Sequence, residues 1–92
     1  MESASSLRKN AEAGDATAQN DLGLMYLFSQ GVEKDYVEAY AWFNLSAENG
    51  YNIAAKSRDS LGRLMPPKQV VDAQKRSKKL KKLIAEKQAD SK

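Results

Sequence analysis

The stretch GVEKDYVEAYAWFNLSAENG, residues 31–50, decides the fold, because it contains one complete helix together with the residues that begin and end it. Asp35 is placed to cap the helix at its N-terminus, and Glu38 follows at the capping-box spacing. Gly50 suits the position after a helix C-terminus, where the backbone takes a positive φ. Such a helix is stable only when other elements pack against it from more than one side, because its apolar residues cover a wide face: Tyr36, Ala39, Tyr40, Trp42, Phe43 and Ala47.

A similar pattern occurs thirty-six residues earlier in the chain. A fixed period of this length is typical of stacked helical hairpins. The matching pairs are Leu7 and Phe43, Ala11 and Ala47, Gly14 and Gly50, and Ala18 and Ala54.

These positions belong to a longer pattern. Its first half, A-x-x-G-D-x-x-A-Q-x-x-L-G-x-x-Y, is met by Ala11, Gly14, Asp15, Ala18, Gln19, Leu22, Gly23 and Tyr26. Its second half is met by Gly31, Val32, Asp35, Ala39, Trp42, Ala47 and Gly50, with Ser46 where alanine is usual. Over about residues 7–62 the chain therefore resembles the Sel-like repeat family, a relative of the tetratricopeptide repeat. The resemblance implies an all-α fold, a short right-handed solenoid of antiparallel helix hairpins.

We expect a single domain over residues 1–92. Residues 3–13 should form an N-terminal stub helix, 14–49 a complete repeat, 50–65 the first helix of a second, irregular repeat, and 67–88 a basic amphipathic capping helix.

Particular residues set the expected helix ends. Asp15 is the predicted N-cap of a helix from residue 16 to about 29, and Asn52 that of a helix from about 53 to 65. Pro66 and Pro67 end that helix and begin the last one. Gly23 costs its helix about 1 kcal/mol relative to alanine, so we expect the partner helix to approach closely there.

The composition excludes several kinds of site. The chain contains no cysteine and no histidine, so it lacks thiolates and the commonest general base and metal ligand. Asp15, Asp35 and Glu38 are explained by helix N-termini. We therefore predict no enzyme and no catalytic, cofactor-binding or metal-binding residue.

The sequence contains no obvious targeting or membrane segment. No apolar run approaches the ~18 residues of a membrane span, and the first residues do not resemble a signal peptide. A cytoplasmic location is the default expectation. An exported protein whose signal peptide had been removed would have the same sequence.

Four aromatic residues could be interpreted as a ligand-stacking cluster or as core. Core is favoured, because aromatic residues at helical spacing are usually buried. They are Tyr26, Tyr40, Trp42 and Phe43.

The last helix has two interpretations. Residues 68–92 carry a net charge of +6, whereas residues 1–67 carry −3. An apolar stripe of Val70, Ala73, Ser77, Leu80 and Ile84, widened by Val71 and Leu83, favours a solubilising cap over the last repeat. The alternative is an anion-binding module for nucleic acid or acidic lipid. Nucleic acid is disfavoured because the helix has no aromatic residue for base stacking. The anion-binding candidates are Lys75, Arg76, Lys78, Lys79 and Lys82.

The preferred function is a protein–protein interaction module. In the superfamily that the chain resembles, the first helices of successive hairpins line a concave groove that holds a peptide or partner helix. The candidate groove residues on the first such helix are Thr17, Asn20, Asp21, Leu24, Leu27 and Phe28. Those on the next are Lys56, Asp59, Ser60 and Arg63.

Leu24 and Phe28 are the expected anchors, since exposed apolar pairs mark contact surfaces. The alternative is that the N-terminal stub covers them. The expected partner is a protein or peptide, or a second copy stacked by its end or its groove.

Overall fold

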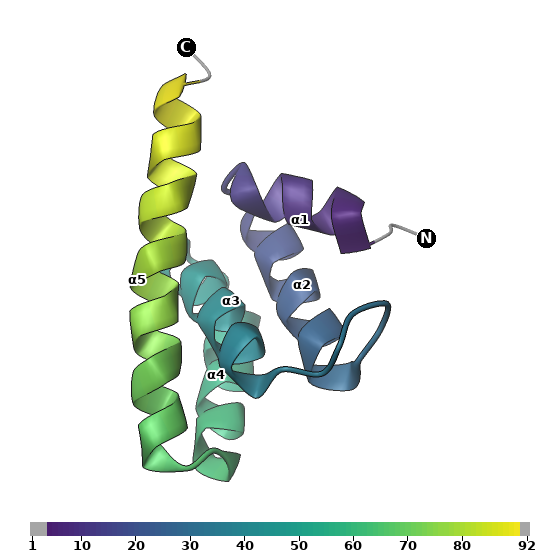
Figure 1. Cartoon of the computed structure of the whole chain (residues 1–92), viewed down its shortest axis with the longest axis vertical. Helices are drawn as coiled ribbons and strands as arrows, with labels where there is room; N and C mark the ends of the chain where they lie inside the picture. Colours follow the sequence, from purple (N-terminus) through teal and green to yellow (C-terminus); the bar gives the residue numbers. More distant parts are fainter. Residues whose placement is uncertain (1–3, 91–92) are drawn as a thin grey trace.

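The computed structural model describes residues 4–90, which fold into five helices and no strand (Figure 1). The helices are α1 (Ala4–Glu12), α2 (Ala16–Phe28), α3 (Tyr36–Glu48), α4 (Asn52–Leu64) and α5 (Pro67–Asp90). The predicted all-α class is confirmed. Residue 3, where the stub helix was expected to begin, lies outside the described residues. No helix in the described range is both long and apolar enough to cross a bilayer.

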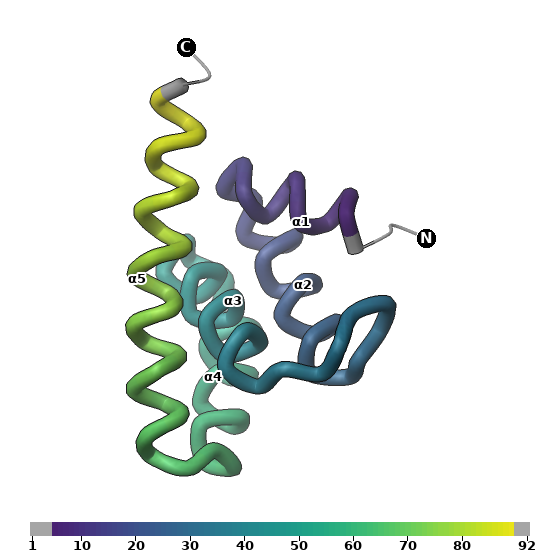
Figure 2. Tube along the Cα trace, viewed as in Figure 1, coloured from purple at the N-terminus to yellow at the C-terminus, as the bar shows by residue number. Residues whose placement is uncertain are grey.

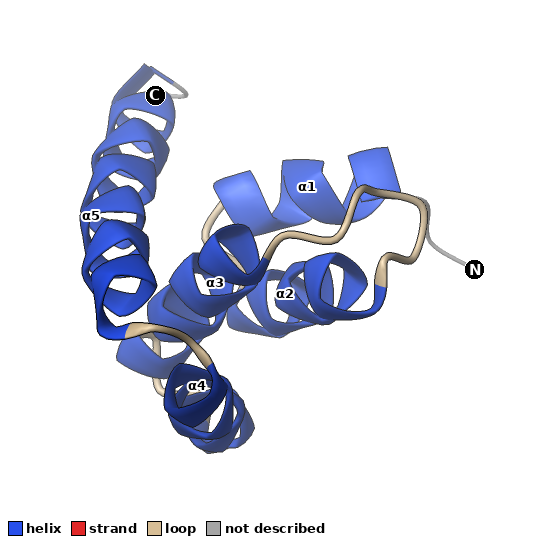
Figure 3. Cartoon of the chain, turned by 60° about the horizontal axis from the view of Figure 1, so that its bottom comes forward, coloured by secondary structure: helices blue, strands red, loops and turns tan. Residues whose placement is uncertain are grey.

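The helix predicted from residues 31–50 lies at the centre of the molecule. α2, α4 and α5 all pack against α3, whereas α1 lies on α2 and touches α5 (Figure 3). Trp42 and Phe43 are fully buried, and Tyr40 is nearly so. α3 is therefore packed from several sides, as its wide apolar face requires.

The apolar core has two parts that meet at α3. In the first, Trp42 and Leu45 pack with residues of α1, α2 and α5, which include Leu7, Leu22 and Leu80. In the second, Ala39, Tyr40 and Phe43 pack with Leu61, Met65 and Ala73. The predicted core role is confirmed for Tyr40, Trp42 and Phe43. Tyr26 lies at the edge of both parts, where its hydroxyl accepts a hydrogen bond from Arg8.

Two of the three predicted N-caps are confirmed. The carboxylate of Asp15 accepts the amide of Ala18 at 3.2 Å, and that of Asp35 accepts the amide of Glu38 at 3.0 Å. Gly50 has the expected positive φ, +91°. The prediction for Asn52 is wrong.

Tyr51 occupies the N-cap position of α4 and makes no side-chain capping bond. The carbonyl of Tyr51 accepts the amide of Ala54 at 3.0 Å. The helix therefore begins at Asn52, one residue before the start at about residue 53 that the sequence predicted. Asn52 is consequently the first helical residue.

Two glycines let α2 and α4 approach α3 closely. A Cβ built on Gly23 would lie 2.7 Å from the ring of Phe43, and one on Gly62 would lie 3.2 Å from the ring of Tyr40. The close approach expected at Gly23 is therefore present, and Gly62 has a similar role on the other flank of α3.

α5 does not cover the last repeat in the expected way. It packs mainly along α3 and continues past it to the level of α1 (Figure 2). Ala73, Ser77, Leu80 and Ile84 are buried as predicted. The expected widening of the stripe is wrong, because Val71 and Leu83 are about half exposed. The side of α4 away from α3 is thus left open.

Candidate functional site

A groove lies between α2 and α4, which flank α3. It encloses about 360 Å³, and side chains of these two helices line it. Leu61 is buried at its base, and Leu24 and Leu27 are partly buried. Phe28 and Leu64 stand at the rims, 62% and 76% exposed. The complete lining is Leu24, Leu27, Phe28, Lys56, Ser57, Ser60, Leu61 and Leu64.

Half of the ten predicted groove residues line this cavity. Leu24, Leu27, Phe28, Lys56 and Ser60 line it. The other surface candidates are not part of the lining: Thr17, Asp59 and Arg63 are exposed, and Asp21 is partly exposed. No α1 residue lines the cavity, and Phe28 remains mostly exposed. The stub therefore does not cover the expected anchors.

Asn20 does not belong to the groove surface. Its side chain is only 4% exposed, because it shares a helix face with Gly23 and Leu27, three and seven residues later, and that face turns towards α3. Its Oδ1 is buried and has no hydrogen-bond partner among the described residues. Burial removes Asn20 from the candidate binding residues.

Leu64 is a groove residue that sequence analysis missed. It follows Ser60, an expected groove position, by one helical turn, so the two share a face of α4. Helical spacing could have identified it. The second repeat, which contains α4, was expected to be irregular. The repeat pattern therefore assigned no position to Leu64.

The basic face of α5 is separate from the groove. Lys75, Lys78, Lys79 and Lys82 are exposed, and no described carboxylate lies within 4.0 Å of their ammonium groups. Arg76 differs, because its guanidinium pairs with a carboxylate of α3. Arg76 is therefore already paired within the chain, unlike the four lysines.

That carboxylate belongs to Glu38, which does more than stabilise a helix N-terminus. One of its oxygens accepts a hydrogen bond from Arg76, and the other accepts the indole N–H of Trp42 at 3.2 Å. The Glu38 side chain is only 15% exposed, whereas Arg76 is 37% exposed. Glu38 thus ties α5 to the central helix.

Replacing Glu38 with alanine should lower the free energy of unfolding by about 1 kcal/mol, because it leaves a partly buried guanidinium and an indole N–H without their acceptor. Solvent at Arg76 keeps the loss below that of a fully buried pair. Glu48→Ala is the matched control, since its pair with Lys81 is exposed and spans 3.8 Å. Urea unfolding should separate the two variants. Equal midpoints would show that the Glu38 contacts contribute little.

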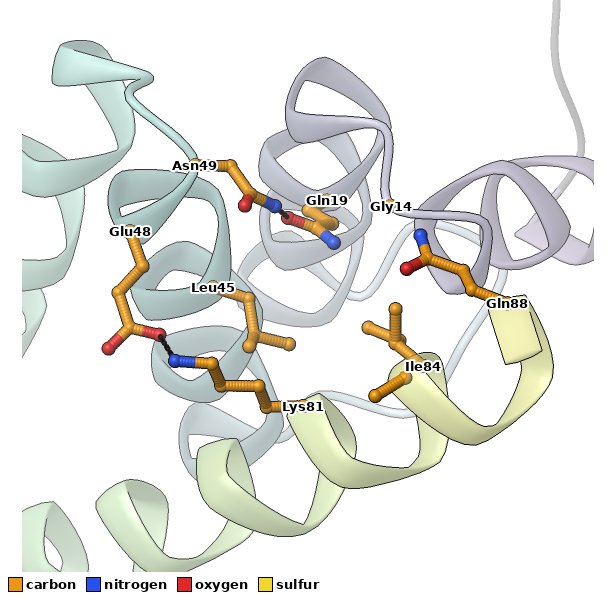
Figure 4. Close-up of a pocket in the computed structure, with 9 residues that line it drawn as sticks. Gly14, Gln19, Leu45, Glu48, Asn49, Lys81, Ile84 and Gln88 are labelled. Atoms are coloured by element: carbon orange, nitrogen blue, oxygen red, sulfur yellow. Dashed lines mark hydrogen bonds and ion pairs between the residues drawn. The ribbon is translucent and has the colours of Figure 1, made fainter.

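A second cavity, of about 270 Å³, lies between the end of α3, the turn before α2 and the second half of α5 (Figure 4). Its polar groups pair with one another: Asn49 donates to Gln19 at 3.0 Å, and the Lys81 ammonium lies 3.8 Å from Glu48. Gln88 donates to a backbone carbonyl of the turn before α2. The contacts of Lys81 and Gln88 join α5 to the end of α3 and to the turn before α2. None of the predicted binding residues lines this cavity.

Comparison with known proteins identifies the repeat. The Sel1 repeat model matches residues 16–51. A protective antigen present in uropathogenic Escherichia coli strains, whose crystal structure displays an SLR fold, matches with a TM-score of 0.81 and 33% sequence identity. The match covers 94% of this chain and 20% of the antigen, so the chain spans about a fifth of the antigen's length. No curated protein matches the chain.

Proposed function

Because the chain belongs to the Sel-like repeat family, we propose that it is a protein–protein interaction module that holds a peptide or partner helix in the groove between α2 and α4. The family is typically non-enzymatic. The proposed mechanism is accordingly binding by shape and by the polarity of the groove.

The observation that carries the proposal is the pair Phe28 and Leu64. They stand on opposite helices at one cavity, and both are mostly exposed. Burying an apolar side chain of this size stabilises a complex by about 1.5–3 kcal/mol at most. Two anchors on so small a surface suit a single helix or a short peptide with modest affinity.

Phe28→Asp should weaken binding of an amphipathic helical peptide at least about tenfold, because it places a charge where an apolar side chain must dock. The probe is a fluorescent peptide with leucines at helical spacing and glutamine elsewhere, measured by fluorescence anisotropy. Val71→Asp is the matched control, since Val71 is also an exposed apolar residue but lies on α5. Equal affinity of both variants would contradict the groove assignment.

Sedimentation equilibrium without peptide identifies a different occupant. If the wild-type chain dimerises and Phe28→Asp is monomeric, the groove holds a second copy of this chain. Circular dichroism should show unchanged helicity, because the Phe28 side chain is mostly exposed.

The exposed lysines of α5 favour a second candidate function, binding of an anionic surface such as acidic lipid. Lys75, Lys78, Lys79 and Lys82 have no carboxylate partner in the described part of the chain. Binding through them should fall steeply with added salt, whereas binding through Phe28 and Leu64 should depend on salt only mildly.

A further inference from the structure

The two rims of the groove carry opposite charges. On α4, Lys56 lines the cavity and Arg63 is exposed two helical turns further on. On α2, Asp21 is partly exposed and lies seven residues before Phe28, so the two share a helix edge. We infer that the groove selects an amphipathic helix with an acidic flank, which lies along α4. This inference rests on the function proposed above.

The positive charge on the α4 rim is available to a partner. Lys56 and Arg63 have no carboxylate within 4.0 Å in the described range. Asp59 lies between them in the sequence, but its carboxylate is held by Arg58 at 3.0 Å. The rim therefore presents two cations about 10 Å apart along the helix axis.

This spacing fits a helical partner. Acidic residues seven positions apart on one flank of a helix are also separated by two turns, or about 10 Å. The apolar groove residues are likewise spaced by single turns, as in Leu24 and Phe28 on α2 and Leu61 and Leu64 on α4. A helix laid in the groove would place anchors at i, i+3, i+4 and i+7 between the helices and its acidic flank against Lys56 and Arg63.

The charges also set the direction of the bound helix. Turning a helix end for end, with its apolar face kept down, exchanges the flanks that face α2 and α4. A helix with glutamates on one flank and lysines on the other can satisfy both Asp21 and the α4 rim in only one direction. Charge complementarity of this kind contributes more to orientation than to affinity.

The test uses three peptides of about 18 residues, a length above the ~12–15 residues at which isolated helices are marginal. They share the apolar anchors, and their flanks carry glutamate on one side and glutamine on the other, glutamine on both sides, or lysine on both sides. The wild-type chain should bind the glutamate peptide about tenfold more tightly than the lysine peptide. In the double variant Lys56→Glu/Arg63→Glu the order should reverse.

Lys75→Glu/Lys82→Glu is the matched control. These residues are exposed, have the same seven-residue spacing and change the net charge equally, but lie on α5. This control should keep the wild-type order of affinities.

Two outcomes separate the inference from the function on which it rests. If the three peptides bind equally while Phe28→Asp still weakens binding at least about tenfold, the inference is overturned and the groove function stands. If no peptide binds, or Phe28→Asp has no effect, both are overturned.

A spin label on the N-terminus of a peptide with glutamate on one flank and lysine on the other tests direction. Exchanging the two flanks should move the broadened amide signals from one end of the groove to the other. Broadening at the same end for both peptides would contradict the proposed orientation.

Discussion

Trp42→Ala should lower the free energy of unfolding by about 3–5 kcal/mol, the usual cost of removing a fully buried aromatic side chain. Trp42 is fully buried where residues of α1, α2, α3 and α5 meet, so no single helix can move to fill the cavity. Its indole N–H also donates to Glu38, and that contact is lost with it. A small domain has only about 5–15 kcal/mol of stability, so the variant should be close to unfolding.

Urea unfolding followed by circular dichroism measures this effect. Phe28→Ala is the matched control, because it removes an aromatic side chain that is mostly exposed and should cost less than about 1 kcal/mol. Similar losses for the two variants would contradict the assignment of Trp42 to the core and Phe28 to the surface.

Gly23→Ala should destabilise the fold by about 2–3 kcal/mol, although alanine is by itself the better helix former by about 1 kcal/mol. The new Cβ would lie 2.7 Å from the buried ring of Phe43 and 3.2 Å from the carbonyl oxygen of Ala39. Neither atom can withdraw without moving α2 away from α3. The separation would also change the groove, since α2 forms one of its walls.

Gly62→Ala is the comparison for this prediction. Its Cβ would meet only the edge of Tyr40, at 3.2 Å, which a small movement relieves. The two variants should therefore differ by at least about 1 kcal/mol in thermal or urea unfolding. A stabilising Gly23→Ala would show that the helices are not held this closely.

Local features could be predicted from the sequence because they depend on neighbouring residues. Asp15 and Asp35 cap their helices, Gly50 takes a positive φ, and the apolar spacing of α3 requires burial on several sides. The close approach at Gly23 could be predicted because glycine is unfavourable inside a helix unless close packing requires it.

Apart from the N-cap predicted at Asn52, the errors involve contacts between different helices. Val71 was expected to be covered, but α5 leans on α3 and leaves it half exposed. Asn20 was predicted to lie on the groove surface. It is buried instead, because its position belongs to the side of α2 that packs against α3. The role of Glu38 could not be predicted, because its partner Arg76 lies thirty-eight residues away.

The central claim, that the groove between α2 and α4 binds a partner helix, is tested most directly by amide chemical-shift mapping. The isotopically labelled chain is titrated with the peptide that carries glutamate on one flank. The largest shifts should cluster at Leu24, Phe28, Ser60 and Leu64, on the two facing helices. Shifts confined to α5 around Lys75, Lys78, Lys79 and Lys82 would contradict it.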